Sequence, residues 1–357
     1  MVNPLLYARS NRIVELMEQP AEERDADWMR DAAQQAVLLE LATLPPYLCG
    51  LWSIDTSTGD GSVFDTIREI VFDEMSHFGL ACNLLTTLGG DLVLADERVV
   101  PTYPGPLPGG VRPELCVSLG GLTQDAAYMY SRIEEPDHPL VLAVAEHTSI
   151  GAFYTALLEA FRAHPERITG ARQLTLDMPH HGAGNNVRPL RTLAAVESAI
   201  DVIKEQGEGT SASPDNPFPG TQGERAHYYA FLEIFHQRKL TENPVTGKFE
   251  FEGAEIPMPD ALPMGTVPEG GWPRTGPSAP DAATTQRLDE FNRLYSTLLS
   301  TLGQAWLQHD ESDGQELLFT AIGQMSELQD PAQQLMAVPL PDGSGKNYGP
   351  EFRFVAP

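Results

Sequence analysis

The stretch REIVFDEMSHFGLACNLLTTLGG, from Arg68 to Gly90, is the part of the sequence that best indicates the fold. Its apolar residues recur at intervals of three and four, as they do on one face of an amphipathic helix. Glu74 and His77 fall within the same apolar stripe. Because burial of a lone carboxylate or imidazole is costly, the stripe predicts a core helix in which this pair has a partner.

The composition excludes several classes of protein. The chain has 357 residues, with 23 Lys and Arg against 50 Asp and Glu, a formal net charge of −27. Such an acidic surface repels nucleic acids and anionic membranes, so neither is an expected partner. The sequence has no run of about 18 or more apolar residues and no secretory signal pattern. Its three cysteines predict reduced thiols, not a disulfide framework, and we expect a cytoplasmic protein.

Four helical blocks are predicted, separated by segments rich in glycine and proline. They span about residues 25–52, 61–88, 139–163 and 189–206, and the last resumes over 223–239. Within the first block, Pro45 and Pro46 are predicted to kink or interrupt the helix, because proline removes a hydrogen-bond donor. Two further helices are expected before the C-terminal tail, over about residues 283–309 and 314–338.

Two long irregular segments accompany these helices. Residues 90–138 are too rich in proline and glycine for a helix, so they predict a long crossover. Residues 240–284 form a second irregular arm, in which one short hairpin is expected. Two helices, a long crossover and two more helices match the ferritin-like arrangement of a four-helix bundle. We therefore predict an all-α protein: a bundle over residues 1–240 and, packed on it in the same structural domain, a covering arm and C-terminal helices over 241–357.

The buried acid and histidine point to a metal centre in the core of this bundle. Two irons need hard anionic oxygens and imidazoles that point into a core from which water is excluded. One glutamate per helix, with Glu-x-x-His on two helices, supplies this set because residues at i and i+3 face the same way. Glu74 and His77 have that spacing. The competing interpretations are a neutralised or hydrogen-bonded core pair, or a helix rotated slightly towards solvent.

Further ligand candidates lie on the inward faces of the other helices. Glu40 in LLELATLPPYL has apolar neighbours on both sides, and Glu146 belongs to the inward face of the third block. His227 shares a face with Phe231, and Glu224 three residues earlier makes a second Glu-x-x-His. The alternatives are a solvated edge for Glu40, a charge in the N-terminal half of its helix that interacts with the helix dipole for Glu146, and a first-turn charge for Glu224.

The fourth block leaves its carboxylates ambiguous. In AIDVIKEQGEG the helical period places Glu208 at the edge of the apolar face and Glu205 nearly opposite, in solvent. The register is open beyond Gly207, since the glycines there could also turn Glu208 inward. Tyrosines near the candidate ligands, including Tyr47 and Tyr154, are expected to be packing residues and not redox relays.

Several blocks together resemble the ferritin-like family of iminophenyl-pyruvate dimer synthase. The blocks are LELATLPPYLCGLWSI, IREIVFDEMSHFGLACNLLTTLGG, YPGPLP, SIGAFYTAL, VIKEQGEGT, ERAHYYAFLEI and YGPEFRF. That family includes the ferritin-like part of the bacterial enzymes that couple two oxidised tryptophan units in violacein and rebeccamycin assembly. The resemblance implies a metal-binding bundle in bacterial specialised metabolism. Position by position, it implies as ligands Glu40, Glu74, His77, Glu208 and His227, with Glu205 as a further position.

The sequence departs from that family in two ways. The third helix of the family usually reads Ile-Gly-acidic-Phe-Tyr, and here the acidic position is Ala152. Either the site lacks one carboxylate, or Glu146 replaces it, or this helix never binds the metal. The tryptophan-coupling enzymes are also much longer chains, so their full activity is not implied.

Our first hypothesis is an enzyme with one or two non-haem irons, which activates O₂ or a peroxide and oxidises a small amino-acid-derived substrate. Iron is preferred, with manganese as the alternative, because the predicted ligands are rich in carboxylate and include no thiolate. A second hypothesis is metal-assisted coupling of an imine delivered by a partner amino-acid oxidase. A third is a non-catalytic metal-binding partner subunit, which the alanine at position 152 favours. The sequence leaves the oligomeric state open.

Overall fold

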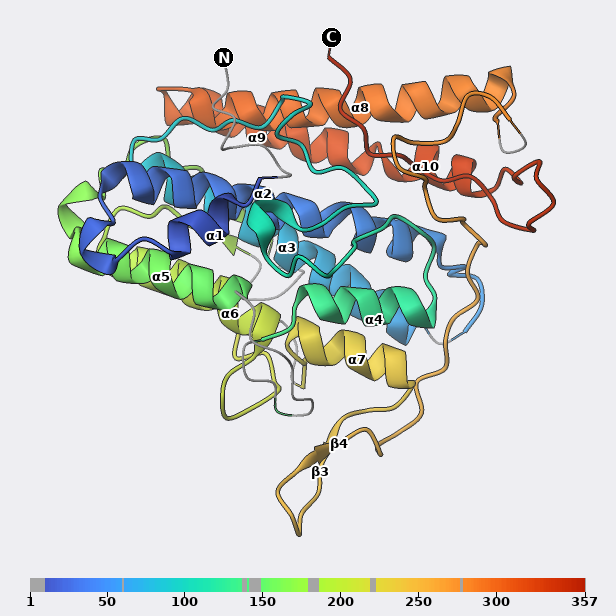
Figure 1. Ribbon diagram of the computed structural model, residues 1–357, viewed down its shortest axis with the longest axis horizontal. Helices are drawn as coiled ribbons and strands as arrows, with labels where there is room; N and C mark the ends of the chain where they lie inside the picture. Colours follow the sequence, from blue (N-terminus) through green and yellow to red (C-terminus); the bar gives the residue numbers. More distant parts are fainter. Residues whose placement is uncertain are drawn as a thin grey trace.

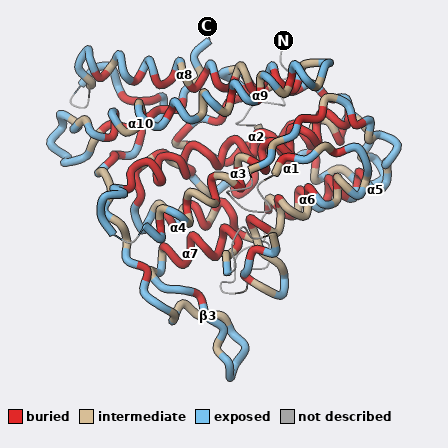
Figure 2. Tube along the Cα trace, turned by 180° about the vertical axis from the view of Figure 1, so that it is seen from behind, coloured by how far each residue is buried: buried red, intermediate tan, exposed pale blue. Residues whose placement is uncertain are grey.

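Two long helices form the centre of the molecule, α2 (Ala26–Ser53) and α3 (Ser62–Thr87). The computed structural model describes residues 10–59, 61–136, 140, 149–178, 186–218, 223–276 and 279–356. The two helices pack along each other, and every residue of α2 from Ala32 onwards is buried (Figures 1 and 2). By length and composition α2 could also cross a membrane, but 94% of its most apolar window lies inside the protein. Its apolar sequence is thus that of a core helix.

Four shorter helices complete the bundle as two pairs. They are α4 (Gln124–Ile133), α5 (Ile150–Ala163), α6 (Leu193–Glu208) and α7 (His227–His236). Helix α5 packs on α6, and α4 packs on α7. In Figure 1 the first pair covers one half of the length of the bundle and the second pair covers the other half. The third and fourth helices of the bundle are therefore each divided in two, and the divisions lie near the middle of α2 and α3.

Helix α4 corrects the prediction of a crossover without helix over residues 90–138. Its ten residues, QDAAYMYSRI, contain neither proline nor glycine, and the side chain of Thr123 caps its N-terminus by accepting a hydrogen bond from the Ala126 amide. The composition of the whole segment concealed this short helix. In the third block the described helix begins at Ile150, where the Ser149 side chain caps it by accepting from the Ala152 amide.

Of the two outcomes predicted for Pro45 and Pro46, a kink or an interruption, the interruption does not occur, because α2 continues through both. Pro46 has no N–H to donate to the carbonyl of Ala42, four residues earlier. The Tyr103 hydroxyl, from the crossover, donates to that carbonyl instead at 2.8 Å. A tertiary hydrogen bond thus replaces the one that the proline removes.

The C-terminal helices form a further layer against α2 and α3 (Figure 1). They are α8 (Ala282–Leu307), α9 (Glu311–Ser326) and α10 (Gln329–Met336). The single helix predicted over 314–338 is thus two helices, and the break turns the buried side chains of α10 towards α2 and α8. Trp306 and Phe352 belong to the same hydrophobic cluster as the bundle helices, so the C-terminal part shares the core of the bundle.

The remaining elements are short. The arm after α7 contains an antiparallel hairpin of β3 (Thr241–Glu242) and β4 (Phe249–Glu250), which projects from the body (Figure 1). A second antiparallel pair consists of β1 (Leu176–Asp177) and β2 (Asn186–Val187). Helix α1 (Arg12–Met17) precedes α2, and short 3₁₀ helices lie at Ala21–Glu23, Pro108–Gly110 and Pro165–Arg167.

Candidate metal centre

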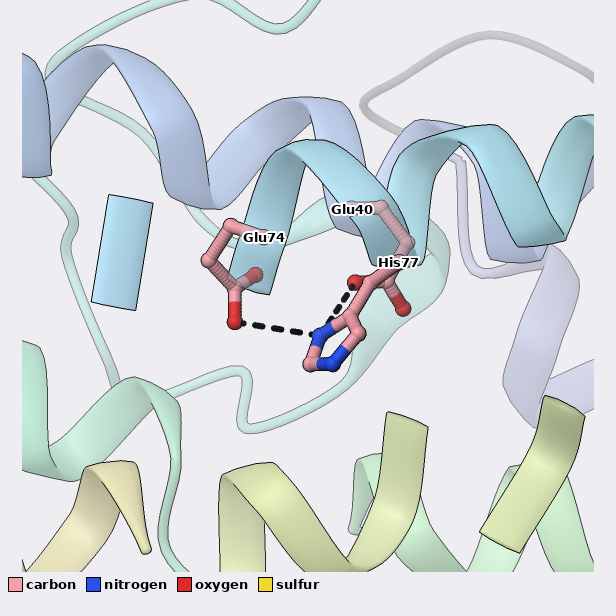
Figure 3. Close-up of side chains that lie close together, drawn as sticks. All are labelled: Glu40, Glu74 and His77. Atoms are coloured by element: carbon pink, nitrogen blue, oxygen red, sulfur yellow. Dashed lines mark ion pairs between the residues drawn. The ribbon is translucent and has the colours of Figure 1, made fainter. Parts of the chain in front are cut away.

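Helices α2 and α3 bring three of the predicted ligands together (Figure 3). Glu74 and His77 lie one turn apart on α3, and His77 Nδ1 is 3.3 Å from Glu74 Oε1. Glu40 projects from α2 towards the same ring, with its Oε2 3.8 Å from His77 Nδ1. All three side chains are buried, so the ionisable atoms face one another and not water.

A second group forms where α4 ends and α7 begins. Glu134 follows the last residue of α4, and His227 is the first residue of α7. His227 Nδ1 is 2.9 Å from Glu74 Oε1 and 3.9 Å from Glu134 Oε2. Glu74 therefore belongs to both groups, and it lies between two histidine rings whose centres are 5.7 Å apart.

The two groups have the composition of two adjacent metal positions. In each group one ligand atom per residue lies within 4.8 Å of the others, which is close enough for all to reach one ion. Each group offers one imidazole, one glutamate of its own and a share of Glu74. Carboxylate oxygens with a few imidazoles suit a hard or borderline divalent cation such as iron or manganese.

Outer hydrogen bonds fix the tautomers of both histidines. His227 Nε2 lies 3.1 Å from Asp73 Oδ2, and His77 Nε2 lies 2.8 Å from Gln206 Oε1. Gln206 Nε2 donates to Asp73 Oδ1 at 3.0 Å. Because a carboxylate only accepts, Asp73 orients the amide so that its oxygen faces His77. Both Nε2 atoms therefore donate, and in the neutral ring each Nδ1 presents a lone pair to the glutamates.

The position of His227 Nδ1 beside the glutamates indicates whether a metal ion fits the site. His227 Nδ1 is buried and makes no hydrogen bond, although Glu74 is close to it. A lone pair that faces carboxylate oxygens is repulsive unless a cation lies between them. A proton on Nδ1 or a metal ion meets that need, and the ligand set thus fits a metal.

Three hydroxyl groups orient the carboxylates. Tyr154 donates to Glu40 Oε1, Tyr47 donates to Glu134 Oε1, and Thr43 donates to Glu74 Oε2 at 2.7 Å. In each case the other oxygen of the carboxylate is the one that faces the histidines. The two tyrosines, expected only to pack, thus also hold candidate ligands in place.

The pKa values reflect crowding of acids in a dry site. Burial and the charge of Glu74 raise the pKa of Glu40 to about 8 and that of Glu134 to about 7. Burial by itself would lower the pKa of His77, but the Glu74 carboxylate raises it to about 9. Without a cation the site therefore holds protons that offset the buried carboxylates, and a bound metal would displace them.

The other predicted ligands that the structure describes belong to neither group, although Glu208 lines the same cavity as the candidate ligands. Glu208 belongs to neither group, and its Oε1 accepts a hydrogen bond from the Gly151 amide at 2.8 Å. Glu205 and Glu224 are half-buried and are also in neither group. Glu146, suggested as a replacement for the missing acid at position 152, lies outside the described residues.

Glu134 is a carboxylate of the site that the sequence pattern does not predict. It lies in the predicted crossover, and its sequence neighbours IEEP resemble a charged turn. Its approach depends on Gly207, where a Cβ atom would lie 3.0 Å from Glu134 Oε2. The glycine of the GEG motif thus gives an indirect signal for a close neighbour at this position.

Four of the five candidate ligands line a cavity of about 20 Å³, which also contacts Ile150, Lys204 and Glu208; they are Glu40, Glu74, His77 and Glu134. About 10–15 Å³ is enough for one water, so this space suits an ion or a water molecule. A larger cavity of about 300 Å³ lies between the α2–α3 connection and residues 257–260, and its lining includes none of the residues of the two groups. We assign the chemistry to the smaller cavity because the candidate ligands are there.

The comparisons with known proteins agree with this fold. The profile of the family described as Ferritin-like matches residues 33–236, which include both groups. A crystal structure of a ferritin like protein from Caulobacter vibrioides aligns with this chain at a TM-score of 0.58 and 19% sequence identity. The alignment covers 92% of this chain and 97% of the Caulobacter chain. The comparison with curated proteins gives no match. Because the family profile spans more than half of the sequence, the chain belongs to the ferritin-like family.

Proposed function

We propose that this protein is a non-haem iron oxidoreductase that uses O₂ or a peroxide to oxidise a small amino-acid-derived substrate in bacterial specialised metabolism. The observation behind this proposal is the carboxylate of Glu74 between two histidines whose far nitrogens are both held by one hydrogen-bonded chain. Burial of two imidazoles and three carboxylates costs stability, and a bound cation would offset that cost.

The residues divide into two sets of ligands. Glu40 and His77 would hold one ion, Glu134 and His227 would hold the other, and Glu74 would serve both. Iron or manganese suits such ligands, and no cysteine belongs to either group in the described part of the chain. When bound, iron would supply one-electron redox chemistry that the side chains lack.

The protein's own contribution is orientation and exclusion of water. Buried helices surround the ligands, which keeps bulk solvent from the reacting atoms. Tyr47, Tyr154 and Thr43 fix the carboxylates, and Asp73 with Gln206 keeps the protons of the histidines on Nε2. The site is thus preorganised for a cation before it binds.

Metal content tests this proposal directly. Protein purified without oxygen should contain one or two irons per chain by mass spectrometry, and air should produce a new absorption band. Glu74→Ala and His227→Ala should lose most of the metal, whereas Glu205→Gln, on α6 but in neither group, should retain it. Substoichiometric metal that is equal in all these proteins would refute the site.

The narrower resemblance supports a related reaction, metal-assisted coupling or dimerisation of an oxidised aromatic amino acid. In that reaction a partner amino-acid oxidase would supply the imine. The support is the order of the matching sequence blocks. Product analysis with an L-amino-acid oxidase and tryptophan would separate the two reactions, because coupling gives a dimer and simple oxidation gives a monomeric product.

A non-catalytic metal-binding subunit is favoured by one observation, the small size of the cavity beside the ligands. A space of about 20 Å³ admits an ion but not an amino acid. Repeated cycles of reduction and exposure to air distinguish this function from the first. A catalytic centre consumes O₂ in proportion to added substrate, whereas a binding protein consumes it once per loaded metal.

A further inference from the structure

A cluster of charges lies beside the second group of ligands, formed by the buried Arg112 and Glu135 and the partly exposed Arg132. Arg112 Nη1 donates to Glu135 Oε2 at 3.0 Å, and its Nη2 donates to the Glu135 main-chain carbonyl. Arg132 Nη1 lies 2.7 Å from the same Oε2. Two guanidinium groups thus face one carboxylate, and the side chains of Arg112 and Glu135 are only 4% and 1% exposed.

Two hydrogen-bond donors in this cluster have no partner. Arg112 Nε and the Tyr228 hydroxyl are both buried, and neither makes a hydrogen bond among the described residues. Arg132 lies on α4 and Tyr228 on α7, and these two helices pack on each other, so the cluster and Tyr228 come from adjoining elements. Buried donors are nearly always paired, and an unpaired set therefore points to an absent acceptor.

Other acidic groups near Arg112 do not fill this need. Glu208 and Glu114 also act on its charge. The first, however, accepts from the Gly151 amide, and the second lies 3.4 Å from Arg132 Nη2. Arg112 Nε remains without an acceptor in their presence.

The cluster adjoins the metal centre through the chain itself. Glu135 follows Glu134, and Tyr228 follows His227, so two sides of the cluster are each one residue, about 3.8 Å between Cα atoms, from a candidate ligand. Arg112 also has a positive φ of 46°, which is strained for a residue with a side chain. Strained backbone is concentrated where a side chain must be aimed for function.

We infer that Arg112 and Tyr228 bind the carboxylate of a substrate beside the metal position of Glu134 and His227. Arg112 Nε can only donate and the Tyr228 hydroxyl is able to donate, and a carboxylate is an acceptor-only group that pairs well with guanidinium. Only the statement that this carboxylate belongs to a substrate rests on the proposed function. The site itself is defined by the two unpaired donors.

The experiment compares acids with their neutral amides. Acetate and 3-phenylpropanoate, against acetamide and 3-phenylpropanamide, are titrated into the purified full-length protein by calorimetry. We expect at least one acid to bind about tenfold or more tightly than its amide, since hydrogen bonds to a charged group are the stronger ones. Equal affinity for acid and amide in both pairs would overturn the inference.

Two variants and a control locate the site. Tyr228→Phe removes only a hydroxyl without a partner, so the fold should persist while the acid loses about tenfold in affinity. Arg112→Gln should abolish the preference for the acid. Tyr229→Phe is the matched control, because its hydroxyl already accepts from the Leu140 amide, and acid binding should not change. Acid binding that survives both test variants would also overturn the inference.

Metal content, measured on the same samples, keeps this result separate from the proposed function. Iron at full occupancy without any preference for the acid refutes the carboxylate site alone. A preference for the acid that Tyr228→Phe removes, in protein without metal, confirms the anion site and refutes the iron centre.

Discussion

Asp73→Asn tests the hydrogen-bonded chain behind the histidines. Asp73 accepts from His227 Nε2 at 3.1 Å and from Gln206 Nε2 at 3.0 Å, so it can serve two donors only as a carboxylate. Asparagine must present its NH₂ group to one of them. If that group faces His227, this ring must accept at Nε2 and carry its proton on Nδ1.

The other orientation of the asparagine amide changes the tautomer of His77 instead of that of His227. If the asparagine NH₂ faces Gln206, the amide of Gln206 must rotate, and its own NH₂ then faces His77 Nε2. His77 would in turn carry its proton on Nδ1. In either orientation one histidine presents an N–H where the metal needs a lone pair, although no ligand has been replaced.

The expected loss of metal affinity follows from the role of Asp73 as a hydrogen-bond partner of a metal-binding histidine. Replacement of an outer partner of a metal-binding histidine typically costs about 10- to 100-fold in affinity, or about 1.4–2.7 kcal/mol. We expect one of two metal equivalents to weaken by this amount in a competition titration against a chromophoric chelator. Asp65→Asn, at an exposed site on the same helix α3, is the control. Wild-type affinity for both equivalents in Asp73→Asn would refute the tautomer argument.

Three further predictions concern the second metal position, pH and the core. Gly207→Ala should weaken one metal equivalent and spare the other, because its Cβ would lie 3.0 Å from Glu134 Oε2; equal weakening of both in the titration would contradict this. The metal-free protein should lose stability as the pH rises from about 5 to 9, because Glu40 (pKa about 8), Glu134 (about 7) and His77 (about 9) bind protons more tightly in the folded than in the unfolded state. The free energy of unfolding should fall by about 1.4 kcal/mol per pH unit for each such proton, as urea titrations at several pH values would measure, and a rise would contradict this. Trp306→Ala should lower the free energy of unfolding by about 3–5 kcal/mol, because the side chain is 1% exposed in the shared core and its indole N–H donates to Asn83 Oδ1. Two separate unfolding transitions in the wild type would instead show that the C-terminal helices unfold independently of the bundle.

The sequence predicts those residues of the site whose burial follows from the spacing of apolar residues within a single helix. Glu74 and His77 interrupt an apolar stripe within one helix, and Glu40 interrupts another, so their burial can be inferred from their immediate neighbours. His227 is likewise followed by apolar residues at helical spacing. Each of these residues lies inside or at the start of a helix that the pattern predicts.

The residues that were missed take their roles from contacts between distant segments. Glu134 is a glutamate after a short helix, and only the Tyr47 hydroxyl and His227 distinguish it from a surface charge. Asp73 has a role because Gln206, from a helix much later in the chain, lies within hydrogen-bond distance. Such pairings depend on how helices are placed in three dimensions, which hydrophobic spacing within one helix does not encode.

The division of the third and fourth bundle helices makes the two metal positions mechanically unequal. Glu40, Glu74 and His77 stand on α2 and α3, two uninterrupted helices packed in the core. Glu134 and His227 stand at the ends of α4 and α7, each of only ten residues, where helices fray most readily. Metal binding should therefore be sequential, with the position on α2 and α3 filled first. An ion there would hold Glu74 in place, so that Glu134 and His227 would then bind the second ion together with an already ordered ligand. A metal titration followed by hydrogen exchange would show this as early protection of α3 and late protection of the first turn of α7.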